Sequence, residues 1–115
     1  MQETMRLNLT KQGDALRVDV AGPVDIDTSP TLRQQVLEAW TPGLKSLELN
    51  FADVDYISSP GLALLLEFRH WLAKEDAEVR LLAASAQVRE VLATCRLDSL
   101  FFPDVNSGPQ VPVAG

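Results

Sequence analysis

The sequence predicts an α/β domain built on a single small mixed sheet, with an N-terminal antiparallel hairpin, largely parallel strands after it, and helices crossing between strands. Alternating apolar and polar residues recur along the chain, and segments of helical periodicity lie between the later alternating segments. A length of 115 residues suits one domain. We expect this domain to occupy residues 1–105, with the Gly- and Pro-rich residues 106–115 as a flexible tail.

The first elements expected are a β-hairpin and a helix. Residues 6–10 and 15–21 alternate in polarity, and the intervening residues 11–14 have the composition of a turn. The segment Asp27-Thr28-Ser29-Pro30 then offers helix caps before apolar residues recur at helical spacing. We expect the first helix over residues 29–40.

The second half of the chain predicts further strands and helices in alternation. Residues 47–51 alternate in polarity and predict a strand, and Pro60 opens an apolar helix that runs to about Lys74. Residues 79–82 predict the next short strand, and Ser85 is expected to cap a third helix. The apolar residues Leu97, Leu100, Phe101 and Phe102 supply a compact apolar end, with a final short strand as one interpretation.

Residues 54–66 are the most informative segment, because two serines and a proline separate an apolar strand end from an apolar helix. A serine side chain at a helix start commonly accepts a hydrogen bond from an unpaired backbone N–H, and a proline at the next position loses none. The pattern predicts Ser59 as the N-cap. The same N–H groups would stabilise a phosphate on Ser59, so the residues alone leave open whether Ser59 caps the helix or acts as a switch.

Composition and charge exclude several classes of function. The net charge is −6 and the Lys and Arg residues are scattered, whereas nucleic-acid binding requires clustered basic side chains. Cys95 is the only cysteine, which fits a reducing cytoplasm and is interpreted as a small core residue. No basic N-terminal start and no long apolar run is present. We expect a cytoplasmic chain with no nucleic-acid partner and no direct membrane insertion.

No group of residues indicates an active site. The only histidine, His70, follows Ser59 by 11 positions on the same expected helix, roughly 16 Å along its axis, too far to act as its base. Asp25 and Asp27 lack a third metal ligand; we expect Asp25 to close a loop and Asp27 or Thr28 to cap the first helix. No glycine-rich phosphate loop occurs. We therefore expect no enzyme activity, cofactor or metal.

Three segments together carry a resemblance to a known family: residues 22–25, residues 50–62, and residues 88–92 with the apolar residues that follow them. In the second segment, a strand ends in Ile57-Ser58-Ser59 before Gly61 and Leu62 open an apolar helix. Over about residues 5–103 the chain resembles the STAS domains, named for sulphate transporters and anti-sigma-factor antagonists. This resemblance implies the STAS fold, in agreement with the predicted mixed sheet.

The resemblance also implies a switch. In bacterial anti-anti-sigma members of the family, a serine in this loop is phosphorylated by a kinase that is itself the anti-sigma factor. The unphosphorylated form binds the kinase and frees the sigma factor, and the phosphate breaks the complex. Position for position this serine is Ser59, with Ser58 as the alternate, and Asp25 matches a family Asp beside it. Pro60 stands where the family usually has Ser, Thr or Ala.

Taken with the residues, the resemblance implies a non-enzymatic anti-sigma-factor antagonist that binds a kinase-type anti-sigma factor, an ATPase of the histidine-kinase-like type. The implied partner-binding residues come from two segments: Asp25, Asp27, Thr28, Ser58, Ser59, Pro60, Gly61 and Leu62. One alternative is a cytoplasmic accessory subunit of a lipid-transport ABC system. Residues 61–66 resemble the corresponding segment in that branch of the STAS domains. A small-molecule or nucleotide-sensing module is a further alternative.

Overall fold

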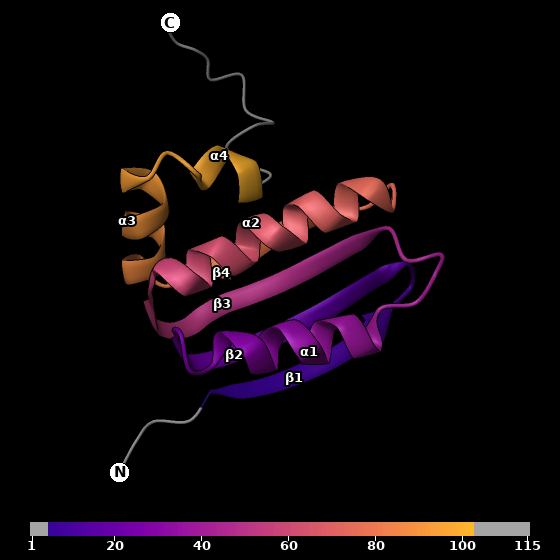
Figure 1. Ribbon diagram of the computed structural model, residues 1–115, viewed down its shortest axis with the longest axis horizontal. Coiled ribbons are helices and arrows are strands. Elements are labelled where there is room, and N and C mark those ends of the chain that lie inside the picture. Colours follow the sequence, from indigo (N-terminus) through magenta and orange to yellow (C-terminus); the bar gives the residue numbers. More distant parts are fainter. Residues whose placement is uncertain (1–4, 103–115) are drawn as a thin grey trace, which may run out of the picture.

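The mixed sheet that the sequence predicts forms the centre of the structure, a computed structural model that describes residues 5–102 (Figure 1). The expected tail over residues 106–115 lies outside the described residues. In chain order the elements are β1 (Arg6–Gln12), β2 (Ala15–Val24), α1 (Ser29–Ala39), β3 (Ser46–Ile57), α2 (Ser59–Lys74), β4 (Glu78–Ala84), α3 (Ala86–Thr94) and α4 (Asp98–Phe101).

The sheet has the strand order β1-β2-β3-β4. β1 and β2 pair antiparallel and form the expected hairpin, in which Gln12 lies opposite Ala15 across a two-residue loop. Gly13, in this loop, has a φ of 62°, a left-handed conformation that glycine adopts at little cost. β2, β3 and β4 pair in parallel, so α1 and α2 serve as the crossovers that parallel neighbours require. The carboxyl ends of β2 and β3 consequently lie at one edge of the sheet.

Alternation along the strands divides the sheet into an apolar and a polar face. Buried residues on the apolar face include Val18 of β2, Leu49 of β3 and Leu81 of β4, which lie opposite one another across the sheet. They share one core with apolar residues of the helices: Leu32, Val36, Leu64, Leu65, Phe68, Leu72, Val88 and Leu92. Figure 1 shows α1 and α2 lying along the sheet on one side.

The end of the described chain differs from the expected final strand. Residues 98–101 form the short helix α4, and the interpretation of a last strand is wrong. The physical reason lies in the spacing of the apolar residues, since Leu97, Leu100 and Phe101 follow an i, i+3, i+4 pattern that places them on one helical face. Phe101 is buried in the core, with Leu97 and Leu100 packed against it.

Cys95 is exposed, which corrects its interpretation as a core residue. It is the C-cap residue of α3, beyond the buried positions Val88 and Leu92 of that helix. The next residue, Arg96, has a φ of 60° and turns the chain at this point. A position at the end of a helix, outside the covered face, accounts for the exposure of the thiol. The expected cap of α3 is confirmed, because Ser85 Oγ accepts a hydrogen bond from the Val88 N–H at 3.3 Å.

Candidate functional site

Two segments far apart in the sequence meet at the carboxyl edge of the parallel strands. Val24, the last residue of β2, lies opposite Ile57, the last residue of β3. The Ser58 N–H donates a hydrogen bond of 3.0 Å to the Val24 carbonyl oxygen. Asp25 and Ser59 each follow one of the two residues that this bond joins. The structure therefore brings together the two loops that were predicted to form one surface.

The loop between β2 and α1 is held by its own side chains. Asp25 Oδ1 accepts hydrogen bonds from the N–H groups of Asp27 at 2.9 Å and Thr28 at 3.1 Å. Thr28 Oγ1 accepts from the Asp25 N–H at 2.9 Å and donates to the Pro23 carbonyl oxygen at 2.8 Å. The expectation that Asp25 closes this loop is confirmed. Thr28 occupies the N-cap position of α1 but its side chain makes no cap bond, because the hydroxyl is used within the loop.

The start of α2 lies one residue earlier than the sequence suggests. Ser58 has extended backbone angles and is the N-cap residue, and its carbonyl oxygen accepts the first helical hydrogen bond from Leu62 N–H at 2.9 Å. Ser59 is already the first helical residue, so the prediction of Ser59 as N-cap is wrong. In the part of the chain that the structure describes, no side chain makes a cap hydrogen bond at this helix start. Pro60 is accommodated in the first turn, where a missing N–H costs no helical bond.

The two serines differ in the accessibility of their hydroxyl groups. Ser58 Oγ is buried and has no hydrogen-bond partner among the described residues. Ser59 is exposed to solvent. An incoming group can reach Ser59 without any opening of the fold, whereas Ser58 Oγ would first have to be uncovered. The accessible nucleophile at this edge of the sheet is therefore the Ser59 hydroxyl.

Gly61 allows the first turn of α2 to lie directly against the ends of β2 and β3. A Cβ atom at this position would come within 2.7 Å of the Val24 carbonyl oxygen and 2.8 Å of Ile57 Cγ1. Contacts under about 3.0 Å are not tolerated without movement, and a backbone oxygen has little freedom to move. Gly61 itself is buried, so its contribution to the site is to position Ser59 rather than to present a side chain.

The remaining predicted site residues lie on the same edge with different degrees of exposure. Asp27 is exposed, whereas Asp25, Thr28, Pro60 and Leu62 are half-buried.

His70 lies in a separate hollow, with Leu66, Arg69 and Leu100 among the residues that line it. Within residues 5–102 no group of three or more His, Cys, Asp or Glu side chains is placed to hold a metal ion. In the same range, no helix is both long enough and apolar enough to cross a membrane.

Sequence reasoning missed a groove between α1 and α2 that adjoins this edge. It has a volume of about 700 Å³, and both Ile26 and Pro60 line it. Ile26, between two aspartates of the β2–α1 loop, is 70% exposed. The one feature of the sequence that could have indicated this groove is Ile26 itself, because an isoleucine between two aspartates fits neither a helical nor a strand periodicity. The other lining residues belong to α1 and α2, and the sequence does not show which sides of these two helices face each other, because this depends on the tertiary packing.

Comparisons with known proteins place this geometry in a family context. Residues 6–108 match the STAS domain family. The anti-sigma-B factor antagonist of Staphylococcus aureus (strain NCTC 8325 / PS 47) is 28% identical over 109 residues, which cover 93% of this chain and 99% of the relative.

Solved structures share the fold. An anti-sigma factor antagonist from Mycobacterium paratuberculosis has a TM-score of 0.75 at 22% identity, over 90% of this chain and 89% of that one. The anti-sigma factor antagonist SpoIIAA in its unphosphorylated form has a TM-score of 0.73 at 19% identity, over 84% and 86% of the two chains. The phosphorylated form of Bacillus SpoIIAA has a TM-score of 0.67 at 18% identity, over 84% and 89%.

Proposed function

Because the chain belongs to the STAS domain family, we propose that it is a partner-switching regulator of the anti-sigma-factor-antagonist type. In this proposal the unmodified chain binds a kinase-type anti-sigma factor, an ATPase of the histidine-kinase-like type, in the cytoplasm. Phosphorylation of Ser59 by this partner ends the complex. The chain itself carries out no chemical reaction, and its only chemical role is that of phosphate acceptor.

The main support for the proposal is that Ser59 is exposed and lies beside the acidic β2–α1 loop, which is held by hydrogen bonds of its own side chains. The Ser58 N–H donates a hydrogen bond to the Val24 carbonyl oxygen. Ser59 comes directly after Ser58 in the chain, and Asp25 comes directly after Val24. The internal hydrogen bonds of Asp25 and Thr28 keep the loop in one conformation before a partner arrives. Preorganised surfaces lose less conformational entropy on binding. The site is thus suited to recognition by a protein.

Phosphorylation at this place would change the surface strongly without unfolding the domain. A phosphoserine carries roughly two negative charges at neutral pH, and here it would add to those of Asp25 and Asp27. Burying this extra charge in an interface is costly because of desolvation and like-charge repulsion. The start of α2 offers a favourable dipole to an anion, which supports a folded phosphorylated state. SpoIIAA, which has the same fold, has been solved in phosphorylated and unphosphorylated forms.

The test is a binding comparison with three baits: the wild-type chain, Ser59→Ala and Ser59→Asp. Partners recovered from the native cell lysate are identified by mass spectrometry, purified and titrated calorimetrically. We expect a kinase-like protein to bind the wild-type chain and Ser59→Ala with the same affinity. It should bind Ser59→Asp at least about thirtyfold more weakly, because this factor is the lower end of the cost of an unpaired charge in an interface. Thr10→Asp, on the exposed and distant strand β1, controls for added charge.

Equal affinity of all three baits for the same kinase-like protein would refute the switch. Recovery of permease or ATPase subunits of a lipid-transport ABC system, equally by all three baits, would instead assign the chain as an accessory subunit. In that case Ser59 would have no regulatory role, and the start of α2 would be a permanent docking surface.

A further inference from the structure

We propose that the groove between α1 and α2 is a binding site for an uncharged amphipathic small molecule, with an apolar body and one hydroxyl or amide group. This inference does not depend on the protein partner proposed for the Ser59 surface, although Pro60 belongs to both places. The groove volume of about 700 Å³ lies within the range typical of small-molecule sites, roughly 300–1,000 Å³. Most of the surface that lines it is apolar.

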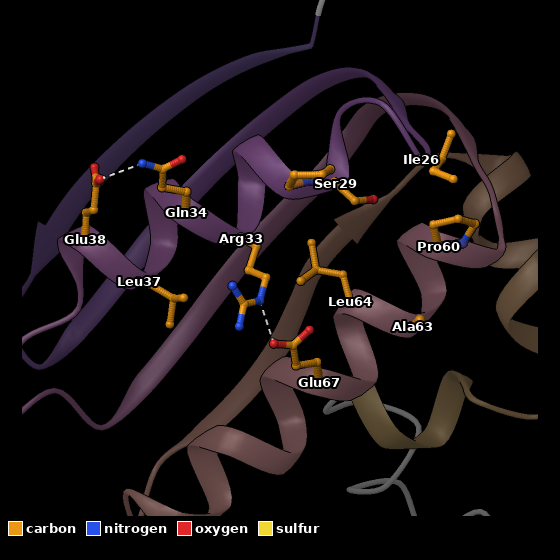
Figure 2. Close-up of a pocket in the computed structure, with 11 residues that line it drawn as sticks. Ile26, Ser29, Arg33, Gln34, Leu37, Glu38, Pro60, Ala63, Leu64 and Glu67 are labelled. Carbon is orange, nitrogen blue, oxygen red and sulfur yellow. Dashed lines mark hydrogen bonds and ion pairs between the residues drawn. The ribbon is translucent and has the colours of Figure 1, made fainter.

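The lining residues distribute the apolar contacts along the whole groove (Figure 2). Ile26 and Pro60 lie at one end, and Leu37 lies toward the other. The buried side chain of Leu64 projects from α2 toward α1 between these ends. Ile26 is 70% exposed and Leu37 38% exposed, so both would lose apolar surface to water on ligand binding. Such burial is the main favourable contribution to binding an apolar body.

A buried hydroxyl group inside the groove lacks a partner. Ser29, the first residue of α1, is only 7% exposed and lines the groove, and its Oγ has no hydrogen-bond partner among the described residues. Figure 2 shows this oxygen pointing away from α1 in the direction of Pro60. Buried polar atoms are rarely left unpaired, because an unsatisfied hydroxyl costs about 1–3 kcal/mol. Because the oxygen itself is covered, a ligand hydroxyl or amide would complete this hydrogen bond once the side chains over the oxygen move aside.

The charges along the groove favour an uncharged ligand over an anion. Among the described residues, Arg33 is the only cation that lines the groove, and its Nε is 2.6 Å from Glu67 Oε2 in an ion pair across the groove. The second carboxylate, that of Glu38, accepts a hydrogen bond from Gln34 Nε2 at 3.0 Å. Carboxylates thus outnumber the cation, and no free positive charge remains among the lining residues for a carboxylate or phosphate. Nucleotides and fatty acids are disfavoured by this arrangement.

The probe for the test is 1-octanol, compared with octanoate, which has the same chain length but carries a negative charge. Each is titrated into the ¹⁵N-labelled chain alone, without a protein partner, and followed by ¹H–¹⁵N NMR. We expect saturable shifts with octanol, confined to amides of α1, α2 and the Ile26 loop. Octanoate should bind at least about tenfold more weakly because of the excess carboxylates. Since no partner is present, the result is independent of whether the Ser59 switch exists.

Three variants locate the binding. Ser29→Ala should weaken octanol binding about fivefold, the equivalent of one lost neutral hydrogen bond. Ala63→Trp, at an exposed position in the groove, should abolish it by filling the space. Ala93→Trp makes the same change on α3, at an exposed position outside the groove, and should leave octanol binding unchanged.

The proposal is overturned if octanol shifts rise linearly and spread over the surface, if octanoate binds equally well, or if Ser29→Ala has no effect. It is also overturned if octanol does not bind while Ala63→Trp abolishes capture of a protein partner, since the groove would then belong to a protein interface.

Discussion

Substituting Gly61 by alanine tests whether the start of α2 is held by close backbone packing. Gly61 lies within a helix, where alanine is favoured over glycine by about 1 kcal/mol from helix propensity alone. Propensity therefore predicts that Gly61→Ala stabilises the domain. Packing predicts the opposite, because the new Cβ would lie 2.7 Å from the Val24 carbonyl oxygen and 2.8 Å from Ile57 Cγ1.

The magnitude follows from comparing the two effects. Overpacking a filled site costs about 1–3 kcal/mol, and the upper end applies because one clashing atom belongs to the backbone. After the gain in helix propensity, a net loss of about 2 kcal/mol remains. For a domain of about 105 residues, each kcal/mol lowers Tm by about 4–5 °C. We therefore expect Gly61→Ala to lower Tm by about 8–10 °C.

The assay is thermal unfolding followed by circular dichroism, with urea unfolding for the free energy of unfolding and Ala63→Gly as the control. Ala63 is exposed two residues further along α2, so its replacement reports helix propensity without a clash and should cost about 1 kcal/mol. Both substitutions should destabilise, although they change the sequence in opposite directions. A Gly61→Ala domain as stable as the wild type, or more stable, would refute the packing argument for this helix start.

Further predictions concern the caps, the loop and the thiol. Ser85→Ala should lower the free energy of unfolding by about 1–2 kcal/mol, because the Ser85 hydroxyl caps α3. Ser59→Ala should change this free energy by less than about 0.5 kcal/mol, because the Ser59 hydroxyl caps no helix. Urea unfolding of both variants compares the two values. Asp25→Ala should speed amide hydrogen exchange in the β2–α1 loop, and Asp25→Asn, which keeps the accepting oxygen, should do so less. Equal exchange in both variants would contradict the bonds of this loop. Exposed Cys95 should react with a thiol reagent in the folded chain; protection until unfolding would contradict its placement.

Much of the fold follows from local pattern. The hairpin, the starts of α1 and α3, and the order of strands and helices are set by alternation, helical spacing and turn residues, all of which act over a few positions. The error at the start of α2 arises because two neighbouring residues satisfy the same local rule. Ser58 and Ser59 are equally good N-cap residues by type, and the structure has Ser58 at this position, with Gly61 packed closely against the strand ends.

The candidate site was predictable only in part. Parallel pairing of β2 and β3 brings the Asp25 and Ser59 loops together, and this follows from topology. The different burial of the two serine hydroxyls does not follow, since it depends on how the first turn of α2 packs. The groove with Ser29 likewise depends on the separation of two helices that are not adjacent in the chain.

In the proposed partner switch, Ser59 is the accessible phosphate acceptor. The most direct measurement is to incubate the chain with its purified kinase-like partner and ATP, and to map the modified residue by peptide mass spectrometry while following the complex by size-exclusion chromatography. We expect one phosphoryl group on Ser59, none on Ser58, and loss of the complex as the phosphoryl group is added. Phosphate on Ser58, or a complex that survives full modification of Ser59, would contradict this expectation.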